Sequence, residues 1–448
     1  MPSTLIVNAH VVNENSTREL DVLIQDGRIA KIDPDLSAQK ADKVIDAKGK
    51  YLMPGMIDDQ VHFREPGLTH KGDIGTESRA AVAGGITSFM EMPNVKPITD
   101  NLQALEDKYQ RAAQKSVANF AFYLGATNKN LETIKRLPYN VACGVKIFMG
   151  ASTGDILVND PDVLDGIFQY CPILIATHCE DTPTIDANLA EAVKKYGDQI
   201  PLSEHPNIRS AEACYMSSDL AIRLAKKHGA NLHVLHLTTA KEMAHFAPGP
   251  IESKHITAEA CVHHLFFNSN DYADLGNQIK CNPAIKTTAD QMAILQAVKE
   301  DRIDIIATDH APHTWQEKQN PSYVKAPAGL PLVQHALLSL LEQVHLNRFT
   351  LEMVVKKVCH NPAIRYKVKE RGFIREGYWA DLVLVDLADT TTVTKESLLY
   401  KCGWSPFEGK TLHGKIAGTW VNGHHVFDGQ SLAADLPHGE RLAFEQHL

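Results

Sequence analysis

The chain has 448 residues, 44% of them hydrophobic and 22% charged, with a formal net charge of −9. That length allows one large domain and a smaller one. The acidic balance argues against a nucleic-acid partner or an anionic membrane surface, and no apolar run approaches the roughly 18 residues of a transmembrane helix.

The N-terminal sequence MPSTLIVNAHVV has neither the basic segment nor the long apolar segment of a secretory signal. The eight cysteines are scattered, with no paired spacing. This distribution is typical of reduced thiols in a packed interior. We therefore expect a cytoplasmic protein of enzyme size.

Both ends of the chain alternate apolar and polar residues, which is the pattern of β-strands. LDVLIQDGRIAKI contains an Asp-Gly pair at 26–27, and TWVNGHHVF contains an Asn-Gly pair at 422–423. Both dipeptides are typical of hairpin turns. The sequence therefore predicts one small β-sandwich domain formed from both termini, comprising residues 1–52 and residues 371–448 with the tail.

The middle of the chain, residues 53–370, alternates short apolar runs with helical patterns. Eight runs have the character of strands: GMIDDQVH, GITSFMEM, ANFAFYLG, CGVKIF, PILIATH, LHVLH, HITAEA and IDIIAT. A helix is predicted at 210–228, where Met216, Leu220 and Leu224 form an i, i+4 stripe and a glycine follows. Eight parallel strands alternating with helices predict an α/β fold, a (β/α)8 TIM barrel.

Polar residues stand where these strands end, and in a TIM barrel the carboxyl ends of the strands form the active site. They are Gln60, His62, Asn94, Lys146, His178, His236, Asn282 and Asp309. Any one of them alone is more often a hydrogen-bonded or packing residue than a metal ligand. Because imidazole, amine and carboxylate groups arrive from four different strands, their convergence predicts a metal site.

Imidazole and carboxylate ligands suit a divalent ion such as Zn2+. Lys146 is unusual in such a set, because an ammonium group repels a metal. It fits if its amine has added CO2, giving an N6-carboxylated lysine that can bridge two ions. Gln60 stands where alternate spacing along the strand would place a second histidine beside His62, and an amide is a poorer zinc ligand. One or two Zn2+ ions per subunit are therefore expected, with Gln60 a doubtful ligand.

Twelve motifs follow one another in an order that carries a specific resemblance: IDDQVHFREPG, EMPN, VKIFM, ATHCE, HLTT, ITAEACVHHL, NPAIK, TDHAPHTWQEK, APAGLP, NPAIRY, GYWADLVLVD and SPFEG. Over nearly its whole length the sequence resembles the dihydroorotases of the amidohydrolase superfamily. The resemblance implies reversible cyclisation of N-carbamoyl-L-aspartate to dihydroorotate in pyrimidine biosynthesis. It also implies a homodimer, and it raises aspartate transcarbamoylase as a partner.

The resemblance further implies two overlapping metal sets, one of His62, carboxylated Lys146 and Asp309, the other of Lys146, His178 and His236. Gln60 stands where the family usually has histidine. Asp309 would shuttle a proton while a metal-bound hydroxide attacks the ring carbonyl. The catalytic residue implied by the resemblance is therefore Asp309.

The substrate site implied by the resemblance consists of Arg64, Asn94, Asn282, His313 and the backbone at Ala328 and Gly329. Arg64 would bind the substrate carboxylate bidentately, and the amide and imidazole groups would add hydrogen bonds. The other interpretation of Arg64 is a surface salt bridge with Glu65. The segment 311–327 is expected to be able to close over the site.

Several further residues near these motifs have less certain functions. Glu259 and either His263 or His264 are expected to orient ligand imidazoles or simply to pack. His233 and Cys179 are expected to be structural, and His310 and Lys286 have no assigned function.

Two other functions compete with the first. An allantoinase or hydantoinase would share the barrel and the metals but would have no substrate carboxylate for Arg64 to bind. A non-catalytic subunit that scaffolds aspartate transcarbamoylase would explain Gln60. Such a subunit would have been free to lose the other ligands and Arg64, yet they are present.

Overall fold

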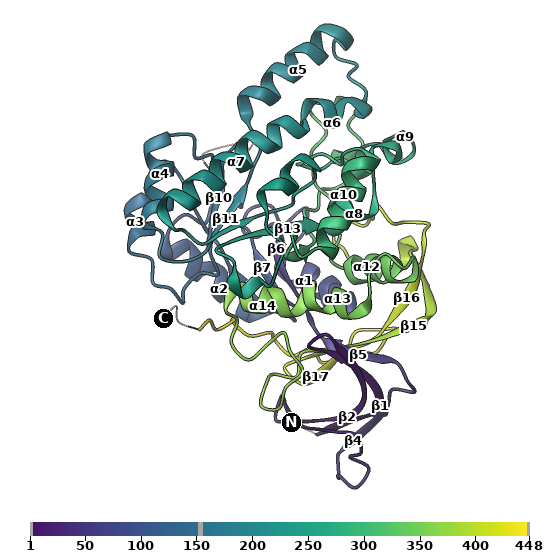
Figure 1. Ribbon diagram of the computed structural model, residues 1–448. Helices are drawn as coiled ribbons and strands as arrows, with labels where there is room; N and C mark the ends of the chain where they lie inside the picture. Colours follow the sequence, from purple (N-terminus) through teal and green to yellow (C-terminus); the bar gives the residue numbers. More distant parts are fainter. Residues whose placement is uncertain (1–2, 151–155, 446–448) are drawn as a thin grey trace.

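The computed structural model describes residues 3–150 and 156–445 (Figure 1). A small β-rich part lies at the bottom of the view, and a larger part of alternating strands and helices lies above it. The strands of the small part are β1 (Thr4–Asn13), β2 (Ser16–Gln25), β3 (Arg28–Asp33), β4 (Lys43–Asp46), β5 (Tyr51–Pro54), β15 (Leu382–Thr392), β16 (Thr411–Val421) and β17 (His424–Phe427).

These strands form one sheet from both ends of the chain, in the order β17-β16-β15-β5-β1-β2-β3, with β4 beside β1. Strand β5 joins the two contributions, because it runs parallel to β1 and antiparallel to β15. Both predicted turns are present, at 26–27 between β2 and β3 and at 422–423 between β16 and β17. The β-domain formed from both termini is confirmed, while its boundaries at residues 52 and 371 stay a prediction.

The larger part contains the predicted barrel. Its strands are β6 (Met56–Val61), β7 (Ile86–Glu91), β8 (Asn119–Phe122), β9 (Leu124–Gly125), β10 (Val145–Phe148), β11 (Ile175–His178), β12 (Leu232–Val234), β13 (Ile256–Cys261) and β14 (Ile305–Ala307). They pair in parallel, in the orders β6-β7-β8 and β9 to β14, and a parallel bridge between Val61 and His310 brings the ends of β6 and β14 together. Each of the eight predicted runs contains a strand, and the (β/α)8 barrel is confirmed.

Fourteen α-helices accompany the strands among the described residues: α1 (Ile74–Ala83), α2 (Leu102–Lys115), α3 (Leu131–Lys135), α4 (Pro161–Tyr170), α5 (Thr182–Tyr196), α6 (His205–Ile208), α7 (Ala211–His228), α8 (Val262–Phe266), α9 (Tyr272–Leu275), α10 (Thr288–Lys299), α11 (Trp315–Lys318), α12 (Ala336–His345), α13 (Leu351–Val355) and α14 (Asn361–Tyr366). Helix α5 projects from the top of the barrel in Figure 1. In the part of the chain that the structure describes, no helix combines the length and apolar character needed to cross a membrane.

Helix α7 has the predicted span but a different buried face. Ser210 caps its start and Gly229, in the left-handed conformation, follows its end. The buried residues are Ala213, Cys214, Ser217, Ser218, Ala221, Ile222 and Ala225, whereas Met216 of the predicted stripe is 47% exposed. Leu220 and Leu224 of the predicted stripe are partly buried and pack against the core, so the stripe lies at the edge of the buried face.

The C-terminal tail returns to the barrel and lies along β8. The Gly439 N–H donates to Ser116 O at 2.7 Å, and Phe120 exchanges hydrogen bonds with Glu440 O and Leu442 N at 2.9 Å each. Leu442 is buried among the side chains that fill the interior of the barrel. The tail therefore belongs to the packed structure of the barrel.

Candidate active site

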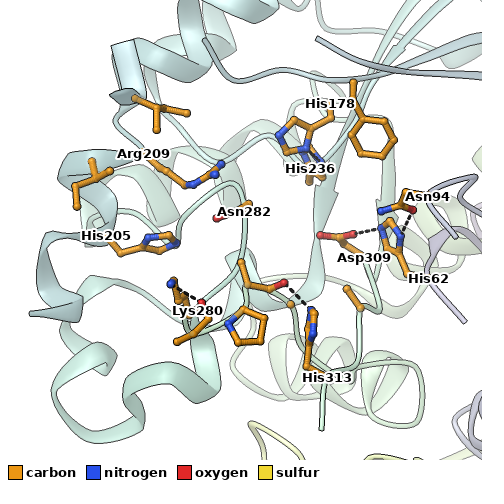
Figure 2. Close-up of a pocket in the computed structure, with 18 of the residues that line it drawn as sticks. His62, Asn94, His178, His205, Arg209, His236, Lys280, Asn282, Asp309 and His313 are labelled. Atoms are coloured by element: carbon orange, nitrogen blue, oxygen red, sulfur yellow. Dashed lines mark hydrogen bonds and ion pairs between the residues drawn. The ribbon is translucent and has the colours of Figure 1, made fainter. Parts of the chain in front are cut away.

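A cavity of about 450 Å3 is lined by residues from the carboxyl ends of the barrel strands. Its lining includes all the predicted site residues: Gln60, His62, Arg64, Asn94, Lys146, His178, His236, Asn282, Asp309, His313, Ala328 and Gly329. Figure 2 shows His178 and His236 beside each other, and His62 linked to both Asp309 and Asn94. The fold thus brings the predicted residues together, and their individual roles stay predictions.

Three of these residues have a backbone conformation that side chains of L-amino acids rarely adopt. The φ angles of Arg64, His236 and Asp309 are 70°, 39° and 50°. Such left-handed conformations cost free energy and persist only where the surroundings hold them, often at functional sites. In each case the kink follows the end of a barrel strand and helps to aim the side chain into the cavity.

The imidazoles of His178 and His236 face each other, with His178 Nδ1 2.9 Å from His236 Nε2. His178 Nε2 donates to Glu180 Oε2 at 2.9 Å, so its Nδ1 carries the lone pair. His236 Nδ1 is buried without a partner among the described residues. Burial and the neighbouring His178 and Lys146 hold the pKa of His236 well below its usual value, which keeps the ring neutral. Two imidazoles at this separation suit two ligands of one zinc ion.

Glu180 supports this pair from behind and was not predicted. It is fully buried and accepts hydrogen bonds from His178 and from Arg209 Nη1. Burial alone would raise the pKa of Glu180, but the charge of Arg209 and the hydrogen bond from His178 lower it to about 2. Glu180 follows His178 by two residues, and this spacing along the sequence ATHCED could have suggested it; Arg209 offers no such signal.

His62, Gln60 and Asp309 form a second cluster. His62 Nδ1 lies 2.7 Å from Asn94 Oδ1 and must donate to it, and His62 Nε2 lies 3.0 Å from Asp309 Oδ1. Gln60 Nε2 donates to the same Oδ1 at 3.2 Å, while Gln60 Oε1 lies 3.8 Å from Cys261 Sγ. The amide therefore presents its N–H group, not its oxygen, to Asp309.

Lys146 lies in the cavity wall, only 1% exposed, with Nζ 4.7 Å from the centroid of the Phe148 ring. No carboxylate of residues 3–150 or 156–445 forms an ion pair with it. Burial lowers the pKa of the Lys146 amine to about 8. A buried amine without a counter-ion, beside imidazoles, fits N6-carboxylation and so fits the predicted metal site.

Arg64 is buried and has no carboxylate partner among the residues that the structure describes. Its Nε donates to Pro312 O at 3.0 Å, and its Nη2 lies 3.1 Å from His313 Nε2. Burial lowers its pKa to about 10, so the guanidinium stays charged at neutral pH. The alternative salt bridge with Glu65 is wrong, because Glu65 pairs instead with Lys115 at 2.7 Å.

The backbone at 326–329 is held by two buried lysines that the sequence analysis did not single out. Lys318 Nζ donates to the carbonyls of Lys280, Pro327 and Gly329 at 3.0 to 3.1 Å. Lys280 Nζ donates to Ala326 O at 2.7 Å. These bonds fix the loop that forms one wall of the cavity.

This arrangement bears on the predicted contacts between the substrate and the backbone at Ala328 and Gly329. The Gly329 N–H already donates to Lys280 O at 2.9 Å, and a Cβ at Gly329 would lie 2.4 Å from Ala311 O. Gly329 is therefore better explained as a residue that permits close packing than as a donor to a substrate. Asn282 lines the cavity, and its Oδ1 is buried without a partner among the described residues.

The remaining residues of interest lie around the cavity rather than in it. Glu259 Oε1 accepts from the main-chain N–H of His236 at 2.9 Å, so it orients a predicted ligand through the backbone. His264 contacts Pro283 O, His310 contacts Glu77, Lys286 contacts Thr238 and Ala284 O, and Cys179 contacts Thr177. None of these contacts involves a predicted metal ligand.

Comparison with known proteins agrees with this geometry. Residues 51–426 match the family model described as "Amidohydrolase family". The chain is 35% identical to the dihydroorotase of Carboxydothermus hydrogenoformans, over 92% of this chain and 94% of that protein. It is 32% identical to the dihydroorotase of Methanosphaera stadtmanae, over 91% of this chain and 93% of that protein.

Among solved structures, the L-hydantoinase (dihydropyrimidinase) of Arthrobacter aurescens superimposes with a TM-score of 0.93 at 26% identity, covering 99% of this chain and 100% of that chain. The dihydropyrimidinase of Brevibacillus agri NCHU1002 gives a TM-score of 0.89 at 24% identity, with the same coverage. The second likeness concerns the fold alone. The sequence is thus more similar to the dihydroorotases than to these hydantoinases.

Proposed function

This chain belongs to the amidohydrolase family, and from that premise we propose that it is a dihydroorotase of pyrimidine biosynthesis. It interconverts N-carbamoyl-L-aspartate and dihydroorotate by closing or opening a cyclic amide. The observation that carries this choice of substrate is Arg64, a buried guanidinium in the cavity wall with no carboxylate partner among the described residues. Burying such a charge is costly unless an anion comes to it.

The surroundings of Arg64 support a carboxylate site. Lys71 Nζ can only donate, and it lies 3.0 Å from His313 Nδ1, so the imidazole proton of His313 is on Nε2. That Nε2 donates to Ala328 O at 3.0 Å and lies 3.1 Å from Arg64 Nη2. The anionic oxygen would therefore accept from the Arg64 guanidinium, and Asn94, whose Oδ1 is taken by His62, has its NH2 group left to donate.

The metal ligands are His62, Lys146, His178, His236 and Asp309, with Lys146 N6-carboxylated and one or two Zn2+ ions per subunit. When bound, the metal would polarise the amide carbonyl and make water a stronger nucleophile at neutral pH. The protein contributes neutral imidazoles whose orientation is fixed by Glu180 on one side and Asn94 on the other.

Asp309 is the proton-transfer group. Its Oδ1 accepts from Gln60 Nε2 at 3.2 Å and faces the lone pair of His62 Nε2 3.0 Å away, a pair that a metal ion would bridge. Its Oδ2 is therefore the oxygen that takes a proton from water and delivers it to the departing amide nitrogen. Asn282, with its buried Oδ1, accepts from an N–H of the substrate ring.

The hydantoinase alternative has structural neighbours in its favour, but hydantoin and dihydrouracil carry no carboxylate to neutralise Arg64. A purely scaffolding subunit would not need a cavity lined by the complete set of predicted ligands. A homodimer, association with aspartate transcarbamoylase and a cytoplasmic location remain part of the proposal. They follow from the family resemblance and the sequence composition.

The test is a comparison of substrates. The purified chain, loaded with zinc and bicarbonate, is assayed with dihydroorotate, hydantoin, allantoin and dihydrouracil, and in the reverse direction with N-carbamoyl-L-aspartate. A site built for the carboxylate should favour dihydroorotate by about 100-fold or more in kcat/KM. Faster turnover of a neutral ring would establish the hydantoinase alternative, and no turnover of any substrate would leave the scaffolding role.

A further inference from the structure

Three titratable side chains from three barrel strands meet inside the barrel and have no part in the mechanism above. They are Asp59 of β6, His233 of β12 and Glu259 of β13, and each is 0% exposed. His233 Nε2 lies 3.3 Å from Asp59 Oδ2 and 3.5 Å from Glu259 Oε2. Buried charges at this depth are costly, so the arrangement needs a reason.

The contacts of His233 show which of its nitrogens carries hydrogen. The Thr257 hydroxyl donates to Leu232 O at 3.3 Å, so it accepts from His233 Nδ1, which lies 2.8 Å away. The other nitrogen faces two carboxylates and is favourably placed there only as an N–H. Burial opposes protonation of this ring, but Asp59 and Glu259 outweigh it and raise the pKa of His233 to about 9.

Glu259 connects this cluster to a predicted metal ligand. Its Oε1 accepts from the His236 N–H at 2.9 Å, and its main-chain carbonyl accepts from the Leu237 N–H at 2.8 Å. Glu259 therefore holds the chain on both sides of the His236 Cα. The φ angle of His236 is 39°, a conformation that must be held from outside.

We propose that Asp59, His233 and Glu259 form a positioning triad for the metal site. The His233 imidazolium, anchored by Asp59, fixes the Glu259 carboxylate. That carboxylate then holds the main chain of His236 in the left-handed form that directs its imidazole toward His178. The proposal rests on the metal site of the proposed function, and none of the three residues touches the substrate or the metal.

Metal affinity tests the triad without any substrate. Zn2+ and Co2+ dissociation constants are measured by competition with a chelator, and the visible spectrum of the Co2+ form reports ligand geometry. Removing partners that orient metal ligands typically weakens binding by 10- to 100-fold. Asp59→Asn should weaken the affinity by about 10-fold and Glu259→Leu by up to about 100-fold. Glu259→Gln should fall between wild type and Glu259→Leu, because its amide oxygen can still accept from the His236 N–H.

A matched control lies beside β13. Asp304 is buried, pairs with Lys254 at 2.6 Å and accepts from the Ala258 N–H at 3.0 Å, but it touches no predicted ligand. Asp304→Asn therefore removes a comparable buried charge and should change metal affinity by less than about threefold. Equal losses in Asp304→Asn and Asp59→Asn would overturn the proposal, because the effect would then be general destabilisation.

The remaining outcomes separate this proposal from the proposed function. Wild-type affinity in folded Asp59→Asn would refute the triad, and so would a wild-type chain that binds neither metal. The expected affinity pattern in a chain that does not turn over dihydroorotate would support the triad while refuting the substrate. The ligand atoms of the three residues lie within 4.8 Å of one another. An ion found among them by anomalous scattering would make His233 a ligand and refute its role as the cation.

Discussion

The two sides of the cavity hold their imidazoles in different ways. On the side of β11 and β12, His178 and His236 turn nitrogen atoms toward each other. Glu180 fixes the ring of His178, and Glu259 fixes the main chain of His236. On the side of β6, His62 and Gln60 both turn toward the same oxygen of Asp309. In the proposed mechanism, one side is arranged around a position for a cation, and the other around a carboxylate that moves a proton.

This difference explains how a chain with glutamine at position 60 can keep a working site. The predicted ligand set of Lys146, His178 and His236 is complete without Gln60. The side that includes Gln60 also presents Arg64, so under the proposed function it would serve the substrate as much as the metal. The two sides should therefore respond differently to substitution.

The largest contrast is expected between His178→Asn and His62→Asn. Loss of His178 removes an imidazole from the complete side, and kcat/KM should fall by about 1,000-fold, roughly 4 kcal/mol, together with most of the bound zinc. His62→Asn should retain zinc on the opposite side. Metal analysis and dihydroorotate assays of both variants measure this. Equal zinc loss in the two would show that the sides are not independent.

Acid should weaken the His178 side through Glu180. The pKa of Glu180 is about 2 in the folded chain, below its ordinary value of 4.5. Its charge therefore contributes stability at pH values above 4.5, and that contribution is lost as the pH falls from 4.5 toward 2. The loss amounts to about 3 kcal/mol.

Denaturant unfolding between pH 6 and pH 3 measures this contribution. Glu180→Gln should be less stable than wild type at pH 6, and the difference should shrink toward pH 3. A difference that stays constant with pH would contradict the assignment.

Arg64→Met tests the β6 side separately, because it should remove the contact with the substrate carboxylate without removing bound zinc. Loss of a hydrogen-bonded charge pair with the substrate carboxylate should cost about 2 kcal/mol, or about 30-fold in kcat/KM for dihydroorotate. Zinc content should not change, and any slow turnover of dihydrouracil should be unaffected. Steady-state kinetics with both rings tests this, and equal losses for both would argue against a carboxylate contact.

The smallest effect is expected from Gln60→His, which would place a second imidazole beside His62, as His178 stands beside His236 on the opposite side. An imidazole at this position should raise zinc content from about one to about two ions per chain. Gln60→Leu is the matched control and should leave zinc content at the wild-type level, because the amide presents its N–H group to Asp309. Metal analysis decides, and a loss of zinc in Gln60→Leu would make the amide a ligand after all.

The sequence predicted the barrel and the residues around its mouth because both depend on local patterns. Each strand is a short apolar run, and the predicted metal ligands stand at or just beyond strand ends, which topology brings to one place. The tight turns at 26–27 and 422–423 were equally local. For these features, chain order and periodicity carry enough information.

The supports behind the site could not be predicted in the same way. These supports act through contacts between residues far apart in the chain, so no sequence spacing indicates them. They include Arg209, Lys318 and the Asp59–His233 pair. The buried face of α7 was also missed, because it is formed by small residues rather than by the larger apolar stripe. Close packing, not hydrophobicity alone, decides which side of a helix is buried.

The tail beside β8 has a consequence for how the protein is made. Leu442 and its neighbours complete the packing beside Phe120, although they are synthesised more than 300 residues after it. At about 5 to 20 residues per second, that interval lasts roughly 15 to 60 seconds. Throughout that time the edge of β8 lacks its covering segment. The nascent barrel should therefore depend on chaperones until residues 439–442 have been synthesised, and truncation before residue 439 should leave it prone to aggregation.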